Sequence, residues 1–153
     1  MEHNLHHRQI TILDADVVRQ HLSKGLGFSA EDRSLNIQRI GYVASLVVKH
    51  GGICLVANIA PFEKDRLANR EMIEREGQYL DVFVDTPVDE CRQRDCKGLY
   101  AKADRGEIKL TGVNDLFEAP INSHFRVNNS NHQQLQTTID QLVEKLKMDC
   151  LID

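Results

Sequence analysis

Two carboxylates stand where a short apolar segment gives way to polar sequence. The run Gln9–Leu13 is apolar and β-branched, which predicts a strand that leads into Asp14 and Asp16. Carboxylates in this position can hold Mg²⁺ through water, or accept a proton from a substrate hydroxyl. The structural alternative is that Asp16 caps the helix that carries Arg19, and the residue pattern alone leaves both roles open.

Basic side chains follow the predicted strand ends, and an aromatic ring accompanies them. Arginine binds phosphate and sulfate oxygens through two parallel hydrogen bonds. Each charge alone fits a solvated surface, but a set that converges on one sheet edge would form an anion cradle. In Gly25–Phe28, two glycines free the backbone around the ring, as in a base-stacking platform; a core Phe beside a turn fits equally well. The basic set is Arg19, Arg33, Arg39, Lys64 and Arg66.

A second basic segment covers residues 94–109 and predicts helix and turn. In small kinases, a mobile segment of this kind closes over the phosphates and excludes water. The alternative is an exposed charged helix. The candidate lid residues are Arg94, Lys97, Lys102, Arg105 and Lys109.

The glycines do not form a phosphate-binding loop. That loop, Gly-x-x-x-x-Gly-Lys-Ser/Thr, would be the strongest sequence evidence for ATP use. None of the nine glycines stands in that frame. Lys24–Phe28 is no substitute, because neither a Lys-Ser/Thr pair nor a strand-to-helix turn follows it.

Strands and helices are predicted to alternate. Ile53–Ala57 is continuously apolar, which predicts a strand buried on both faces. Before it, Ser29 with Asp32 predicts a capping box at the start of a helix, and Gly51 with Gly52 predicts the end of that helix.

The rest of the chain continues the alternation. Thr86 is predicted to be an N-cap, with Pro87 at the first helical position. A charged helix is expected over residues 64–75, strands over 79–84 and 125–127, and an amphipathic helix at the end. The order predicts an α/β fold with a parallel sheet and helices on both faces. Ligands of such folds lie beyond the carboxyl ends of the strands. These ends are Asp14–Asp16, Asn58–Pro61 and Asp85–Pro87.

Length and composition predict a single domain, residues 1–153. The net charge of −4 argues against a nucleic-acid binder. No window approaches eighteen uncharged apolar residues, and no N-terminal stretch resembles a signal peptide. The cysteines form no Cys-x-x-Cys pair and are interpreted as reduced thiols of a cytoplasmic protein. They are Cys54, Cys91, Cys96 and Cys150.

Taken in order, several stretches resemble the adenylyl-sulfate kinases, P-loop kinases that phosphorylate the ribose 3′-hydroxyl of adenosine 5′-phosphosulfate (APS). They cover about residues 9 to 120, with family-like spacing. The matching stretches are Leu13–Arg19, Leu26–Arg33, Asn36–Ile40, Ile59–Arg66, Lys97–Tyr100, Thr111–Gly112 and Glu118–Pro120.

The resemblance implies a role for each segment. ATP would be the phosphoryl donor, with Mg²⁺ near Asp14 and Asp16, of which Asp16 would be the metal ligand. Phe28 would stack on the adenine of APS, and the residues 94–109 would be the lid. The expected partners are APS, with a second copy of the chain or an ATP sulfurylase. The phosphosulfate end and the rest of the pocket would be bound by Arg19, Arg33, Asn36, Asn58, Ile59, Ala60, Pro61, Lys97, Leu110 and Thr111.

The sequence departs from the family pattern at several points. Ala15 replaces a glycine between the aspartates, Leu110 replaces an aromatic that would give the second face of the adenine sandwich, and Ala60 replaces a serine. The family's first strand and phosphate loop are also missing, and residues 2–8 resemble the tail of the helix that follows them. Each preorganised donor of such a loop is worth about 10²–10³ in rate, so feeble turnover is expected.

Three interpretations follow from this pattern. The first is an adenylyl-sulfate kinase whose isolated chain is weak or inactive because the phosphate loop is absent. The second is a non-catalytic APS-binding or regulatory module of a sulfate-activating complex. The third is a remnant without stable fold, which would show a broad unfolding transition and strong dye binding.

Overall fold

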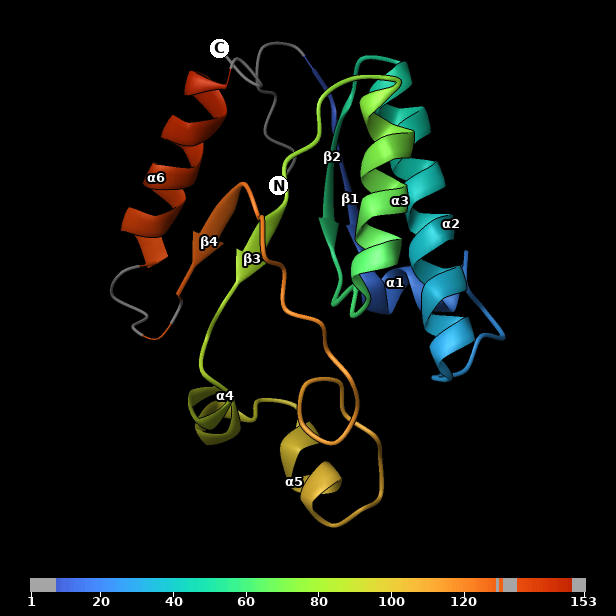
Figure 1. Cartoon of the computed structure of the whole chain (residues 1–153), viewed down its shortest axis with the longest axis vertical. Coiled ribbons are helices and arrows are strands. Elements are labelled where there is room, and N and C mark those ends of the chain that lie inside the picture. The colour runs from blue at the N-terminus through green and yellow to red at the C-terminus, as the bar shows by residue number, and fades with distance from the viewer. Residues whose placement is uncertain (1–7, 129, 131–134, 150–153) are drawn as a thin grey trace. The chain divides into compact units, whose positions relative to one another are not determined.

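The computed structural model describes residues 8–128, 130 and 135–149 (Figure 1). Its chain forms two compact units, with the division after Tyr79. Cys150 and residues 2–7 of the predicted helix tail lie outside the described residues. Within the described ranges, no helix is both long and apolar enough to cross a membrane.

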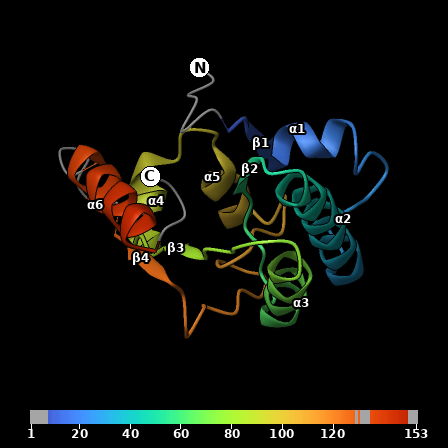
Figure 2. The same cartoon turned by 90° about the horizontal axis from the view of Figure 1, so that it is seen from above.

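The first unit consists of two parallel strands and three helices. Strands β1 and β2 pair in parallel, and Asp14 lies opposite Ala57, so both strands end at the same edge. Helices α2 and α3 pack side by side against this sheet (Figures 1 and 2). The elements are β1 (Ile10–Asp14), α1 (Ala15–Gln20), α2 (Ala30–Lys49), β2 (Ile53–Ala57) and α3 (Glu63–Glu74).

Helix α2 begins as predicted at Ser29, whose hydroxyl accepts a hydrogen bond from the Asp32 backbone N–H at 3.1 Å. The second half of the predicted capping box differs. The Asp32 carboxylate accepts from the Gly27 N–H at 2.9 Å, so it ties the helix to the preceding turn. The helix ends at Lys49, and Gly51 follows with a φ of +78°, a conformation that glycine adopts without steric cost.

The core of this unit is the seam between α2 and α3. Ile37, Ile40 and Ile73 are buried there. Polar groups cross the same seam: the Ser34 hydroxyl donates to the Asp65 carboxylate at 2.6 Å, and all the polar atoms involved are buried. Burying such groups costs free energy unless they are paired, so the seam fixes how far one helix is shifted along the other.

Asn69 fits into this seam because position 41 has no side chain. Its Nδ2 donates to the Ile37 carbonyl at 2.9 Å, and its amide lies where a Cβ on Gly41 would stand, 2.1 Å from Oδ1. The two helices can therefore approach closely only with glycine at this position. Packing at this density leaves no space for even one methyl group.

We expect Gly41→Ala to lower the free energy of unfolding by about 1–3 kcal/mol through overpacking. Chemical denaturation followed by circular dichroism would measure it. The control is the same substitution in the Asn69→Ala background, where the amide is gone. There, Gly41→Ala should be neutral or stabilising, since alanine is the better helix residue by about 0.5–1 kcal/mol. An equal loss in both backgrounds would contradict the packing explanation.

Strand β2 differs from its prediction as a strand buried on both faces. Leu55 is 51% exposed, and its parallel partner on β1, Ile12, is 62% exposed. In the first unit, α2 and α3 pack against the sheet, and Val56, which projects from the face opposite to Leu55, is also 41% exposed. The apolar run therefore predicted a strand correctly, but the prediction that both faces of the strand are buried is wrong.

The second unit also contains a pair of parallel strands, β3 (Val82–Val84) and β4 (Phe125–Val127). Strand β3 is three residues shorter at its start than predicted. The predicted N-cap at Thr86 is wrong by one residue: Pro87 is the cap of α4 (Val88–Arg94). The remaining helices are α5 (Leu99–Asp104) and α6 (Leu135–Met148). Parallel strands that alternate with helices confirm the predicted α/β class.

Candidate functional site

The junction between β1 and α1 carries the two predicted carboxylates. Oδ1 of Asp14 accepts hydrogen bonds from the backbone N–H groups of Asp16, at 2.9 Å, and Val17, at 3.3 Å. Asp14, not Asp16, is therefore the N-cap of α1, which corrects the structural alternative considered above. An Asp at this position typically stabilises a helix by about 1 kcal/mol. Asp16 lies in the first helical turn, and both side chains are exposed.

Phe28 lies on the surface and is surrounded by arginine. The residue is 67% exposed, which excludes a core role. The Arg19 guanidinium lies 4.4 Å from the ring centroid, within cation–π distance, and the Arg33 guanidinium lies at 5.9 Å. The geometry places two cations next to a flat apolar surface. That combination suits an aromatic anion, whose ring can stack while its charged end meets guanidinium groups.

Backbone carbonyls hold the two arginines in place around the ring. Nη1 of Arg19 donates to the Gly27 carbonyl at 3.0 Å and to the Leu26 carbonyl at 3.4 Å. Nε of Arg33 donates to the Phe28 carbonyl at 2.9 Å. The loop before α2 is therefore organised by the same side chains that the sequence predicted as anion ligands.

Asn36 lies one turn after Arg33 on α2, so the two side chains share a helix face. Asn36 is 5% exposed, and its Oδ1 has no hydrogen-bond partner among the described residues. A buried acceptor in this state costs free energy, which a ligand donor would recover. The structure thus supports the predicted grouping of Arg33 with Asn36 on α2.

The loop after β2, Asn58–Pro61, begins at the same sheet edge as the β1–α1 junction, because Asp14 and Ala57 are opposite each other in the ladder. Ala60 has a φ of +43°, which is unusual for a residue with a Cβ. Its carbonyl accepts a hydrogen bond from Nη1 of Arg66 at 2.6 Å. Backbone groups of this loop are held in a defined conformation.

The predicted anion cradle is only partly formed. Arg66 is buried and ion-paired with Glu63. Arg39 donates to the Leu22 carbonyl at 3.0 Å, and Lys64 lies 5.8 Å from the Phe62 ring centroid. The cradle prediction treated all five charges alike, whereas the fold gathers only Arg19 and Arg33 around Phe28.

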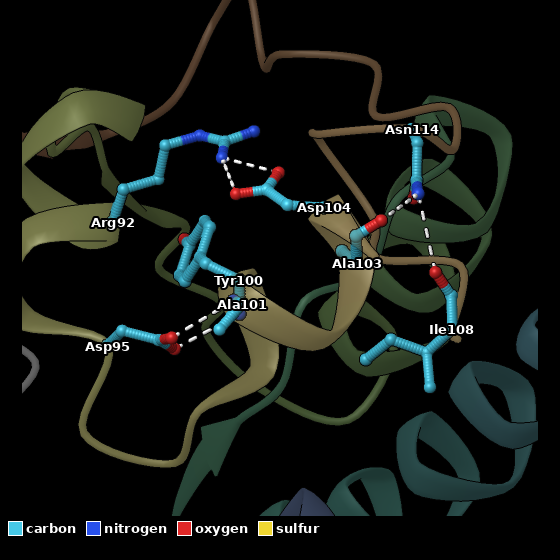
Figure 3. Close-up of polar contacts among 8 residues, drawn as sticks. All are labelled: Arg92, Asp95, Tyr100, Ala101, Ala103, Asp104, Ile108 and Asn114. Carbon is cyan, nitrogen blue, oxygen red and sulfur yellow. Dashed lines mark hydrogen bonds and ion pairs between the residues drawn. The ribbon is translucent and has the colours of Figure 1, made fainter. Parts of the chain in front are cut away.

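The second unit contains the predicted lid segment, which is organised by Arg92 and Asp95 (Figure 3). Arg92 pairs with the Asp104 carboxylate at 2.6 Å, and its guanidinium lies 5.8 Å from the Tyr100 ring centroid. Partial desolvation raises the pKa of Asp95, but the backbone N–H groups of Tyr100, Ala101 and Leu99 outweigh it, so the pKa is lowered. Asp95 accepts from the first two of these at 3.0 and 3.1 Å, so its carboxylate satisfies N–H groups in the first turn of α5, whose N-cap is Gly98.

Asn114 closes the turn that follows α5. Its side chain accepts a hydrogen bond from the Leu110 N–H at 2.6 Å. It also donates to the carbonyls of Ile108 at 3.3 Å and Ala103 at 3.5 Å (Figure 3). Thr111 bridges to Asp115 in the same turn. Hydrogen bonds therefore fix the backbone of the turn that contains the predicted site residues Leu110 and Thr111.

The basic lid residues do not behave as one set. Arg94 donates to the Ser130 carbonyl at 2.8 Å, and Arg105 pairs with Glu107 at 2.5 Å. Lys97, Lys102 and Lys109 are exposed. The prediction missed Arg92, Asp95 and Asn114, which organise this segment, because their partners lie at irregular sequence intervals that no periodic pattern marks.

The predicted site residues are divided between the two units. The first unit holds the carboxylates, the arginines around Phe28, Asn36 and the loop Asn58–Pro61. The second holds the remaining predicted residues. These are Arg94, Lys97, Lys102, Arg105, Lys109, Leu110 and Thr111.

Comparison with known proteins places the fold. The structure resembles that of the APS kinase CysC of Mycobacterium tuberculosis, in complex with AMPPNP and APS, with a TM-score of 0.77 and 38% identity. The match covers 86% of this chain and 78% of that one. The fold is therefore the α/β fold of the P-loop kinases.

Sequence comparison identifies the family within the P-loop kinases to which the chain belongs. The family model described as adenylylsulphate kinase matches residues 1–128. The adenylyl-sulfate kinase of Chloroflexus aurantiacus is 56% identical over 71% of this chain and 58% of its own length. The sulfate adenylyltransferase of Aspergillus oryzae is 43% identical over 95% of this chain and 26% of its own. This chain belongs to the adenylyl-sulfate kinase family.

Proposed function

We propose that the protein binds APS and is of the adenylyl-sulfate kinase type, in which the γ-phosphoryl group of ATP passes to the ribose 3′-hydroxyl. The observation that carries this proposal is the exposed Phe28 ring with Arg19 and Arg33 around it. The ring offers a stacking surface for adenine, and the guanidinium groups offer charge to the phosphosulfate. The APS-bound structure of the mycobacterial relative supports the choice of ligand.

The α2 helix would orient the substrate. Arg33 and Asn36 project from adjacent turns of α2, so a phosphosulfate bound to one lies within reach of the other. The backbone of Asn58–Pro61 would close one side of the pocket.

Asp14 and Asp16 are suited to Mg²⁺, because carboxylate oxygens are the donors that this ion prefers. No cluster of three or more His, Cys, Asp or Glu side chains suited to a metal occurs in the described part of the chain. The ion would therefore be held by one or both carboxylates with water and substrate phosphates, the usual arrangement in kinases. When bound, it neutralises phosphate charge. Asp16 would also orient the 3′-hydroxyl by accepting its hydrogen bond, and would take its proton when the phosphoryl group is transferred.

The proposal separates APS binding from turnover. The sequence contains no Gly-x-x-x-x-Gly-Lys-Ser/Thr loop. Phosphoryl transfer depends on backbone and lysine donors that cradle the triphosphate. The 153 residues by themselves should therefore bind APS but transfer the phosphoryl group slowly or not at all.

We would test this with the purified chain. Isothermal titration calorimetry measures APS binding with and without ATP, and mass spectrometry measures 3′-phosphoadenylyl sulfate after incubation with ATP, Mg²⁺ and APS. The expected result is saturable APS binding that does not need ATP, with little product. Absence of APS binding would overturn the proposal. A family-like rate would leave the function standing and show that other residues hold the triphosphate.

A non-catalytic APS-binding module is the second candidate function. It needs only the Phe28 ring and the arginines around it, which the first unit contains. The match to a segment of a sulfate adenylyltransferase supports an ATP sulfurylase as partner, and a second copy of the chain is the other candidate. Cytoplasmic location stays a prediction.

A further inference from the structure

The β2–α3 loop contains a residue in a disfavoured conformation. Ala60 has a φ of +43°, where the Cβ of any residue other than glycine crowds the backbone. Such a conformation persists only where the surrounding structure enforces it, and it occurs often at ligand-binding sites. The loop follows Ala57, which pairs with Asp14, so it stands at the edge where the candidate site lies.

Arg66 supplies that enforcement. Its side chain is only 9% exposed, although arginine is almost never buried without partners. Nη1 donates to the Ala60 carbonyl at 2.6 Å, while Nε donates to Glu63 Oε2 at 3.0 Å. The planar guanidinium thus connects Glu63, in the first turn of α3, to Ala60, in the loop before the helix. A lysine, with one nitrogen, could not hold both partners in this geometry.

We propose that Arg66 is a positioning residue for APS: it holds Ala60 in the left-handed conformation and so orients the backbone of Asn58–Pro61 toward the substrate. This inference rests on the proposed function, because it assigns the loop to the APS pocket. Arg66 itself does not touch the substrate. The charge that the sequence predicted as part of an anion cradle therefore acts on the loop.

The alternative is that Arg66 only stabilises the start of α3. The two roles differ in what else must change. A role confined to the helix would alter the melting temperature and leave the APS affinity of the folded protein alone. A positioning role would alter the affinity, and the size of the effect would depend on the residue at position 60.

The first experiment compares Arg66→Met with Arg70→Met by calorimetric titration of APS. Arg70 is a matched control, because it lies one turn later on α3 and pairs with Glu74 at 2.7 Å. Arg66→Met should weaken APS binding about tenfold, the usual effect of removing a charged hydrogen-bond donor. Arg70→Met should change it by less than about twofold, as expected for an exposed ion pair.

The second experiment repeats Arg66→Met in the Ala60→Gly background. Glycine adopts positive φ without steric cost, so in the Ala60→Gly background the loop depends less on the clamp, which is the hydrogen bond from Arg66 to the carbonyl of residue 60. The loss of affinity from Arg66→Met should shrink to about threefold or less, a coupling that a double-mutant cycle detects. A role in helix stability alone would give the same ratio in both backgrounds.

The outcomes are distinguishable. If the unmodified protein does not bind APS, the proposed function fails and this inference with it. If the protein binds APS and Arg66→Met binds it equally well, the inference alone is overturned. Should Arg66→Met not fold, Arg66→Lys decides: it keeps the charge beside Glu63, and unchanged APS affinity would overturn the clamp.

Discussion

Phe28→Ala is expected to weaken APS binding by about 10- to 100-fold, because stacking of a base on an aromatic ring is worth about 1–3 kcal/mol. The ring is exposed in the absence of ligand, so its removal should leave the melting temperature nearly unchanged. Calorimetric titration of APS, beside a thermal melt, measures both quantities. The effect should fall on the affinity and not on the fold.

Two variants sharpen this test. Phe28→Leu keeps apolar bulk without the flat ring, and should recover only part of the affinity. Tyr42→Ala removes an exposed aromatic side chain that lies on α2, about two and a half turns beyond Arg33, and should leave APS binding unchanged. If Phe28→Ala binds APS as tightly as the unmodified protein, the stacking role of this ring is wrong.

Arg33→Met is expected to weaken APS binding by about 100-fold, the second large effect. A charge-assisted hydrogen bond contributes about 1.5–3 kcal/mol, and a guanidinium can make two to one anion. Part of the loss would come from the loop, since Arg33 also donates to the Phe28 carbonyl. Titration at two salt concentrations separates the contributions, because the electrostatic part falls with ionic strength.

Matched substitutions define the role of Arg33. Arg33→Lys keeps the positive charge and loses the bidentate geometry, so it should remain well below the unmodified protein in affinity. Lys49→Met removes one positive charge from the far end of the same helix, where Lys49 faces Glu76 at 3.6 Å. That variant should bind APS normally; an equal loss in it would show that only the overall charge matters.

Local chemistry made the elements predictable. Ser29 and Gly51 marked the two ends of α2 because capping depends on residues that are neighbours in sequence. The grouping of Arg19 and Arg33 near Phe28 could also be predicted, since these residues and the neighbouring glycines lie close together along the chain. Such patterns predict the conformation of a segment and show which functional groups it contains.

Contacts between distant segments were not predictable. Nothing near Leu55 tells how many faces of its strand are covered, and nothing near Arg66 tells that its guanidinium is buried against a carbonyl of the preceding loop. Asp14 and Asp16 are both suitable caps by type, and the point where β1 ends and α1 begins decides between them. These outcomes depend on the fold as a whole.

The seam between α2 and α3 limits how this protein can diverge. Arg33 and Asn36 alternate along α2 with Ser34, Ile37 and Gly41, which face the neighbouring helix. The proposed substrate contacts and the helix packing thus lie in the same few turns of α2, so a change that suits one tends to disturb the other. We therefore expect a larger residue at position 41 to require a smaller one at position 69, which couples the two positions through packing.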